Sequence, residues 1–456
     1  MKMKKFSFVA LLTGAIFLLS ANATYAYPWF ARKLVDSCNK CHTAFPQNND
    51  YGQYVKYSGY ELPQISYDGL EESVIRRFLR YFPVAGRFEI DAINSGPSEL
   101  RGDVNVREAQ LISGGSILNN KVSWWFHKHV VQENEFISLF DGTPHEMWGQ
   151  YNLRFSKNDV TRVSLRYGMS ELPLVFSPSK TMLSEIPYAI YNAALGANKF
   201  TLSTPEYGFA VLATKMGGDN YNQVKANAQM AVVNGKAEFS NGFSNIFGRL
   251  SVPIGRTSLG TFAYFGSGEL MMAVAEEHGE EHGEEGGEHE EEPMEQDMGM
   301  MMENSYYRLG LDFTCSIAPN ANFYALALYG RDSNPLAFAE SQAGRFFGGF
   351  AGLDYFMNER LMLQFRYDGV RFDSPIVEQH DDEMGEEHED SMDDMDHEGE
   401  GDHLHGALVT ADMDDIVLGL HFIPFKQFER LKLVTEYKFG LKGTGDLLMS
   451  GFHLAF

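Results

Sequence analysis

The chain has few cysteines for its length. Only three occur among 456 residues, at positions 38, 41 and 315. Three cysteines cannot build the disulfide framework that stabilises many small secreted proteins. Cys315 stands alone in an alternating apolar and polar run, so we expect it to be a small apolar residue of a strand. The other two are separated by only two residues, which points to a different chemistry.

Long apolar runs are also missing. After residue 26, no stretch offers the ~20 consecutive apolar residues that a membrane-spanning helix needs. The apolar run Phe8–Leu19 is shorter, follows a lysine-rich start and leads to Thr24-Tyr25-Ala26. That order is typical of a secretory signal peptide. We therefore expect residues 1–26 to be removed and the mature chain to begin at Tyr27.

Basic residues are absent from two segments that carry the excess negative charge. The formal net charge is -25. Residues 276–303 hold 13 Asp and Glu, residues 378–405 hold 14, and neither segment contains Lys or Arg. Together they account for 27 of the 62 acidic residues, and the remaining 35 nearly balance the 37 Lys and Arg. The acidity is therefore a property of two insertions.

The sequence does contain a repeated alternation of apolar and polar residues, and it is rich in Phe (35), Tyr (22) and Gly (44). Runs of about 10 alternating residues separated by turn residues are the signature of a transmembrane β-barrel. We count sixteen runs, which predicts an all-β, sixteen-stranded outer-membrane barrel over residues 83–456. Fourteen or eighteen strands and a soluble β-sandwich are the alternatives. The runs centre near Phe88, Gln110, Phe126, Tyr151, Leu165, Val211, Ala228, Gly248, Phe262, Leu311, Ala327, Ala351, Phe365, Gly419, Val434 and Phe452.

The connections between these runs alternate in length. If the first strand runs outward, even-numbered strands precede short connections such as Gly114–Asn120 and Asn358–Glu359, as periplasmic turns require. Odd-numbered connections include the long stretch Ser170–Pro205 and both acidic segments. We therefore expect the acidic segments on the cell exterior and both termini in the periplasm.

A CxxCH motif, Cys38-Asn-Lys-Cys41-His42, follows the expected signal peptide. Two thiols at this spacing add to the vinyl groups of a haem, and His42 then lies where it can ligate the iron. A redox CxxC pair or a zinc half-site is the alternative, but no other Cys or His occurs in residues 27–82 to complete one. We expect one haem c on a short, mostly helical or irregular segment, residues 27–82.

That segment lacks a usual second axial ligand, because it contains no Met and no His besides His42. The iron is then open on one side, ligated by the barrel, or ligated by the α-amine of Tyr27. In the run 121–131, His127 and His129 share the polar face that a barrel turns to its lumen. They are the barrel's candidates, although lumen histidines are often simply polar lining. The amine alternative rests on the start Tyr27-Pro28-Trp29-Phe30-Ala31, which resembles the opening of cytochrome f, where the N-terminal amine is the second ligand.

The stretch 28–60 contains Pro28–Lys33, Cys38–His42, Phe45-Pro46, Asn49, Gly52 and Gly59. With these residues it resembles the fused cytochrome–porins of iron-oxidising bacteria. The resemblance implies a monohaem segment ahead of an outer-membrane barrel and oxidation of Fe(II) at the cell surface. It also implies that electrons pass through the haem to a periplasmic carrier cytochrome, which would make the chain an oxidoreductase. Membrane lipid is an expected partner and nucleic acid is not.

The two acidic segments depart from that family's pattern and leave the metal open. They contain clustered histidines together with methionines: His278, His282 and His289 in the first, and His380, His388, His397, His403 and His405 in the second. Carboxylate and imidazole suit divalent Fe, Mn, Ni, Cu or Zn, and thioether favours Cu(I). The segments are too poor in apolar residues to fold alone, so we expect either a weak cation collector or a solvated brush. A metal-selective porin with a structural haem plug, and a conduit for electrons from copper or a mineral, are the alternative functions.

Overall fold

The structure is a computed structural model of the chain. It describes residues 41–44, 47–48, 50–57, 60, 84–94, 103–118, 121–132, 135–136, 145–154, 161–176, 184, 186–217, 223–235, 243–271, 301–335, 343–358, 360–373, 409–423, 431–442 and 444–455. The expected signal peptide, Tyr27, Cys38 and the eight histidines of the acidic segments lie outside the described residues.

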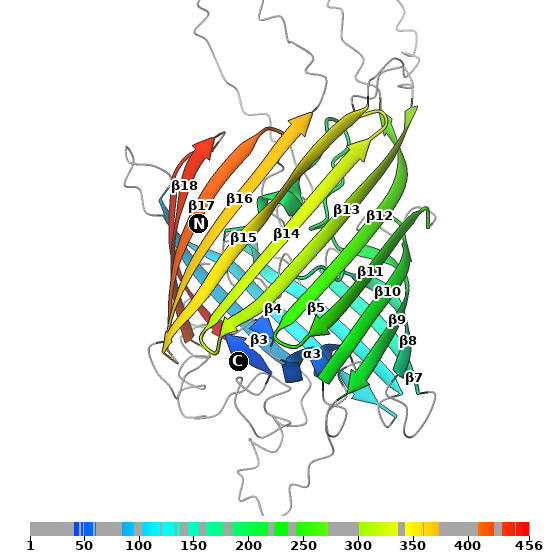
Figure 1. Ribbon diagram of the computed structural model, residues 1–456, viewed down its shortest axis with the longest axis horizontal. Helices are drawn as coiled ribbons and strands as arrows, with labels where there is room; N and C mark the ends of the chain where they lie inside the picture. Colours follow the sequence, from blue (N-terminus) through cyan, green and yellow to red (C-terminus); the bar gives the residue numbers. More distant parts are fainter. Residues whose placement is uncertain are drawn as a thin grey trace, which may run out of the picture.

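The described strands form one closed antiparallel barrel (Figure 1). It runs from β3 to β19 in chain order, and β19 pairs with β3 to close it. The strands are β3 (Val84–Asn94), β4 (Asp103–Ile117), β5 (Val122–Gln132), β6 (Glu135–Phe136), β7 (Glu146–Arg154), β8 (Thr161–Ser170), β9 (Glu206–Gly217), β10 (Gln223–Val233), β11 (Asn245–Ile254), β12 (Thr257–Met271), β13 (Met301–Ala318), β14 (Ala321–Asp332), β15 (Gly344–Asn358), β16 (Leu361–Asp373), β17 (Met413–Phe422), β18 (Leu431–Lys442) and β19 (Leu447–Ala455).

The predicted barrel is confirmed. β6 has only two residues and β5 also pairs directly with β7, so sixteen of the described strands make the wall. All sixteen centres named from the sequence fall within them. Two boundaries were wrong. β4 continues to Ile117 through the expected turn, and β13 begins at Met301, inside the expected acidic segment.

The alternation makes the barrel polar inside and apolar outside. On β13, the side chain of Arg308 is buried, whereas Leu311 three residues on is 64% exposed. Arg366 is likewise buried on β16, between exposed Phe365 and Tyr367. A soluble protein would have the reverse arrangement, because exposed apolar surface is costly in water. The outer surface is therefore the surface of a membrane-spanning barrel.

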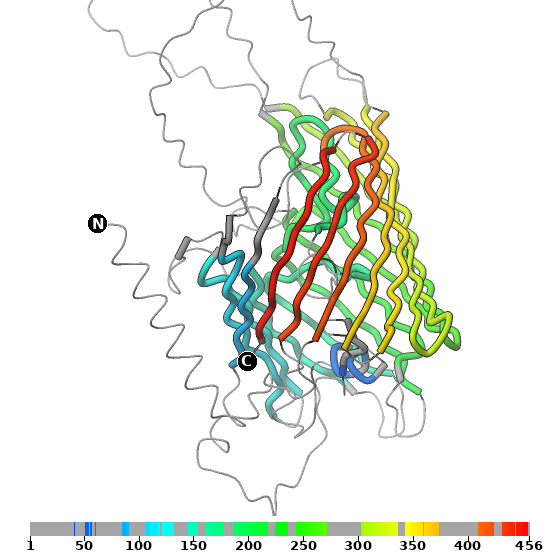
Figure 2. Tube along the Cα trace, turned by 90° about the vertical axis from the view of Figure 1, so that its left-hand side faces the viewer, coloured from blue at the N-terminus to red at the C-terminus, as the bar shows by residue number. Residues whose placement is uncertain are grey.

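The long connection between β8 and β9 folds into the barrel instead of extending from it (Figures 1 and 2). Its 3-10 turn η2 (Ala189–Asn192) is buried and lies against β15 and β16. The apolar side chains of the connection, Leu172, Leu174, Phe176, Tyr188, Ile190, Leu195, Phe200 and Leu202, form one buried cluster with wall residues of β9 to β17. Burial raises the pKa of Tyr188 and Tyr191, so both hydroxyls remain neutral. This part of the lumen is a packed core.

Wall side chains hold the infolded connection through hydrogen bonds. Glu436 on β18 accepts bonds from Ser184 Oγ at 2.9 Å and from the backbone N–H of Ile186 at 3.0 Å. Arg366 on β16 donates to the carbonyl oxygens of Ile186 at 2.8 Å and Pro187 at 3.2 Å. The same guanidinium lies 4.5 Å from the ring centroid of Tyr188. Charged groups of the lumen therefore supply hydrogen-bond partners for backbone polar groups that burial of this connection would otherwise leave unsatisfied.

The chain ahead of the barrel contributes the hairpin β1 (His42–Ala44) and β2 (Gln47–Asn48) and the helix α3 (Asp50–Tyr57). α3 lies beside β10, at the barrel end that carries short turns such as Pro319–Asn320 (Figure 1). No helix among the described residues is both long and apolar enough to cross a membrane.

We predict that the packed connection limits ion flow. Glu436→Ala removes the acceptor for two buried donors. This loss should weaken the attachment of the connection to the wall by about 3 kcal/mol. Planar-bilayer recordings should show low conductance for the wild type and a clear rise for Glu436→Ala. Thr435→Ala, at the outward-facing neighbour on the same strand, is the control and should conduct like the wild type. Equal conductance in the wild type and Glu436→Ala would show that the connection does not restrict the lumen.

Candidate haem site on the lumenal wall

Three imidazoles gather on the lumenal wall of β5 and β7. His127 and His129 are two residues apart on β5 and therefore share its inner face. His145 directly precedes β7, whose Glu146 is the cross-strand partner of His127. The ring centroids lie 5.0 Å apart for His127 and His129, 4.8 Å for His127 and His145, and 5.3 Å for His129 and His145. All three side chains are buried.

Carboxylates orient two of these rings. Nε2 of His145 lies 3.1 Å from Oε1 of Glu171, and Nδ1 of His129 lies 3.3 Å from Oε2 of Glu108. A carboxylate beside one ring nitrogen holds the proton on that nitrogen and leaves the lone pair on the other. Nδ1 of His145 and Nε2 of His129 are then the nitrogens suited to ligation. This pattern is common among histidines that bind metals and haem iron.

The carboxylates belong to a wider charged network. Glu108 lies 3.6 Å from the guanidinium of Arg87, which also pairs with Glu89. Glu89 in turn lies 2.9 Å from Nδ1 of His453 on β19. These buried groups occupy neighbouring strands on both sides of the β3–β19 seam. Their mutual pairing compensates for the cost of removing the charges from water.

The segment ahead of the barrel docks directly beside the imidazoles. The ring of Tyr60 stacks on Trp125 at 5.2 Å and on Trp148 at 5.7 Å, with interplanar angles of 14° and 18°. The two tryptophans are cross-strand partners on β5 and β7. Ser116 Oγ donates to the carbonyl oxygen of Tyr60 at 3.3 Å. The segment that carries the CxxCH motif is thereby attached to the lumenal wall.

The spacing along the strands links this dock to the imidazoles. Trp125 is two residues before His127, and Trp148 is two residues after Glu146. Two residues of a strand span about 6.6 Å on the same face. The docked segment therefore lies one side-chain row from the histidines.

The sequence interpretation identified part of this site. His127 and His129 were expected on the lumenal face, and the structure places them there and beside each other. His145 was missed, because it lies outside an alternating run; its only signal was the adjacent polar pair His145-Glu146 at a strand start. Lys128, which lies between them in the sequence, is also buried.

The described residues place the expected haem ligands only in part. His42 begins β1, and Cys41 precedes it and forms no disulfide. Within the described part of the chain, no three His, Cys, Asp or Glu side chains are positioned to hold a metal ion together.

Comparisons with known proteins identify no family for this chain. No family model and no curated protein matches the chain. Among solved structures, the outer membrane channel DcaP of Acinetobacter baumannii is 10% identical, with a TM-score of 0.46 over 82% of this chain and 96% of that chain. The anion-selective porin from Comamonas acidovorans is 10% identical, with a TM-score of 0.47 over 82% and 98%. The outer-membrane expressed OmpT of Vibrio cholerae is 7% identical, with a TM-score of 0.47 over 82% and 97%. Identities this low establish no residue correspondence.

We predict that Tyr60 holds the preceding segment on the barrel. Tyr60→Ala removes two aromatic pairs worth about 1 kcal/mol each, which should raise the detached fraction roughly thirtyfold. Timed trypsin digestion should then cut at Lys56 faster while the barrel stays intact. Tyr151→Ala, at an exposed tyrosine on β7, is the matched control. Unchanged cleavage in Tyr60→Ala would mean that the stack does not anchor the segment.

Proposed function

We propose that this chain is a monohaem cytochrome–porin of the outer membrane. It takes electrons from a reduced metal outside the cell, with Fe(II) the foremost candidate, and passes them to a periplasmic carrier cytochrome. The observation that carries the proposal is the docking of Tyr60 against Trp125 and Trp148, one side-chain row from three buried histidines. The resemblance of residues 28–60 to the fused cytochrome–porins supports the same function.

The residues of this chain fit a covalently held haem. Cys38 and Cys41 would bind it, and His42 would be one axial ligand. Of the two candidates from β5, His129 fits the second axial position better, because Glu108 beside Nδ1 leaves Nε2 with the lone pair. His127 and the α-amine of Tyr27 are the other candidates. When bound, the haem supplies a one-electron redox centre.

The packed lumen favours electron transfer over metal transport. A hydrocarbon layer ~30 Å thick bars ions and is too thick for one direct electron-tunnelling step. The infolded connection fills part of the lumen with apolar side chains, which hydrated cations enter at high cost. A metal-selective porin needs an open polar path. Electron transfer needs only a redox centre within the wall.

The acidic segments 276–303 and 378–405 are a cation collector in this proposal. β12 and β13, and β16 and β17, present their ends to these connections at the same end of the barrel (Figure 1). That end is opposite the short turns. Clustered carboxylates there raise the local concentration of divalent cations over the barrel mouth. Their histidines, named above, add ligands that suit transition metals.

We predict that Fe(II) reduces the haem of the intact protein. Outer membranes containing the wild type should give a reduced c-type spectrum after anaerobic addition of excess Fe(II) at neutral pH. Cys41→Ser and Cys38→Ala should lose the covalently bound haem and the response. A haem that stays oxidised with excess Fe(II), together with metal flux into liposomes, would replace this function by that of a metal-selective porin.

We predict that one histidine of β5 is the second axial ligand. His129→Ala should abolish the low-spin spectrum, and His127→Ala should leave it largely unchanged. His421→Ala is the matched control, because His421 is also buried in the lumen and lies 3.4 Å from a carboxylate, that of Glu436. Low-spin spectra that survive both β5 substitutions would assign the ligand to His145 or Tyr27, which His145→Ala distinguishes, and a high-spin wild type would mean an open iron.

A further inference from the structure

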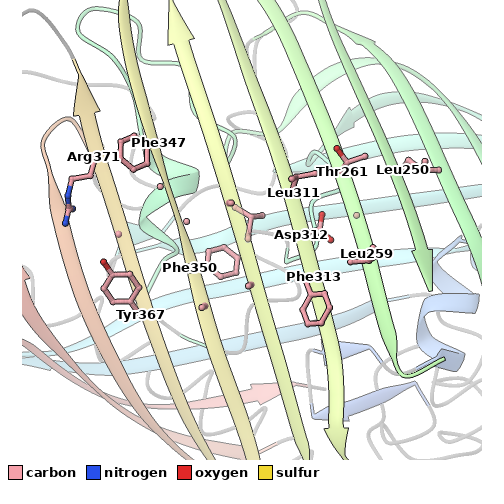
Figure 3. A pocket seen from close by; sticks show the side chains of 18 of the residues that line it. Leu250, Leu259, Thr261, Leu311, Asp312, Phe313, Phe347, Phe350, Tyr367 and Arg371 are labelled. Atoms are coloured by element: carbon pink, nitrogen blue, oxygen red, sulfur yellow. The ribbon is translucent and has the colours of Figure 1, made fainter. Parts of the chain in front are cut away.

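The outer wall carries a hollow that no part of the proposed function uses. It has a volume of about 1150 Å³ and lies over β11 to β17. Figure 3 shows Tyr367 and Arg371 on one side and Leu259 and Phe313 on the other, with Leu311 between them. Pockets of ~300–1,000 Å³ hold drug-sized molecules, so this hollow is large enough for a long apolar ligand.

Small residues on three neighbouring strands create the hollow. Ala327 on β14 pairs with Gly349 on β15, which pairs with Gly369 on β16. The next row on the same face contains Ala325 and Ala351, which are cross-strand partners. No side chain larger than a methyl group therefore projects into lipid at these five positions. Exposed large residues surround them, among which Phe347 is 59% and Leu311 64% exposed.

Steric contacts require glycine at the two glycine positions, but no such contact requires alanine at the other three. A Cβ on Gly349 would lie 1.9 Å from the carbonyl oxygen of Leu326, and one on Gly369 would lie 2.8 Å from the Tyr367 hydroxyl. Ala325, Ala327 and Ala351 already carry a Cβ that points away from the barrel. Larger side chains would be expected there on a wall that meets only fluid lipid.

One end of the hollow is polar. Arg371, two residues from the end of β16, pairs with Asp414 and donates to the carbonyl oxygens of Val370 and Met413, both at 2.9 Å. Asp414 also accepts a 2.6 Å bond from the Tyr367 hydroxyl. These bonds use three of the five guanidinium N–H donors, and the Arg371 side chain remains 33% exposed. The hollow thus joins an apolar body to a cationic end that can accept a further anion.

Other charged groups lie at this end of the barrel. Lys442 donates to Asp412 at 2.8 Å, and Arg345 lies 3.7 Å from Asp373. Most of these charges are paired, so the attraction to an anion comes mainly from directed donors of Arg371.

We propose that the hollow binds a membrane lipid that carries a phosphate group. Its acyl chains lie over Ala325, Ala327 and Ala351, where they gain close contact with a concave apolar wall. Its phosphate accepts from Arg371 at the long-loop end of the barrel. The headgroup of one lipid lies at the polar end of the hollow, and its acyl chains lie over the apolar body.

A second copy of the chain related by a two-fold axis fits this surface less well. A two-fold contact would place the same surface on both partners, so hollow would face hollow. Two facing hollows would leave a void at the centre of the interface, which forfeits the contacts that stabilise it. Flexible acyl chains fill a concave surface without this loss.

The test measures lipid retention by the full chain. Protein reconstituted in vesicles of phosphatidylethanolamine and phosphatidylglycerol is released into mild detergent, and native mass spectrometry counts bound lipid. Ala327→Phe and Ala351→Phe should each reduce retained lipid about tenfold, because they overfill the hollow. Ala263→Phe, at an outward-facing alanine of β12 outside the hollow, should retain lipid like the wild type.

A second arm tests the headgroup. Arg371→Gln should lower retention of phosphatidylglycerol and leave retention of diacylglycerol, which has no phosphate, unchanged. All variants should keep the heat-dependent gel shift of a folded barrel. Equal lipid in the wild type and Ala327→Phe would overturn the proposal. So would wild-type masses of two or more chains that become single chains in Ala327→Phe, because the hollow would then be a protein interface. Both results are independent of whether the haem proposal holds.

Discussion

Closure of the sheet is the constraint on which the rest of this structure depends. In lipid, a strand edge with unpaired backbone N–H and C=O groups costs several kcal/mol per group, so a membrane-spanning sheet must have no edge. The pairing of β19 with β3 supplies that closure over eight residue pairs, from Leu448 with Asn94 to Ala455 with Arg87. Once the sheet is closed, each strand has one face in lipid and one in the lumen.

The enclosed face creates the second problem, which is how to bury charge. In the lumen, charged side chains form close pairs. The Arg249 guanidinium donates two hydrogen bonds of 2.6 and 2.9 Å to the Asp312 carboxylate, and the Arg308 guanidinium lies 2.6 Å from the Asp332 carboxylate. Such pairs are retained because removing one partner would leave the other as an uncompensated buried charge, which is strongly destabilising. The histidine–carboxylate pairs at His129 and His145 follow the same rule. What distinguishes them chemically is that imidazole keeps a second nitrogen after the first is satisfied.

The strands were predictable because the two faces meet different solvents. Lipid and lumen impose a two-residue period, and the sequence keeps it well enough that all sixteen predicted centres lie in wall strands. Turn boundaries were less predictable, since Gly114–Ile117 can pair as well as turn. A period specifies which face a side chain takes, but not where pairing stops.

The infolded connection and His145 lay beyond that reasoning. Ser170–Pro205 was expected as an outer loop from its position, yet it contains Leu172, Leu174 and Ile190, which are costly to expose to water. Its apolar content was the available signal, and its partners on the wall come from β9 to β17, far away in sequence. His145 joins His127 only because β7 pairs with β5 across a connection that carries no period. The positions of the connection and of His145 both depend on contacts between strands that are far apart in the sequence.

The way the lumen is filled bears directly on function. The apolar cluster of the connection packs against β9 to β17, whereas Tyr60 and the three imidazoles lie against β4, β5 and β7. Glu171, at the start of the connection, joins the two regions through its contact with His145. An open pore would gain nothing from an apolar core in its lumen, because such a core obstructs hydrated solutes. A conduit for electrons gains from it, because a rigid dry wall fixes the distance and environment of a redox centre and excludes competing ions. Under the proposed function, the packed core stabilises the wall against which the segment around Tyr60 docks, and the barrel would serve as the scaffold of the haem site.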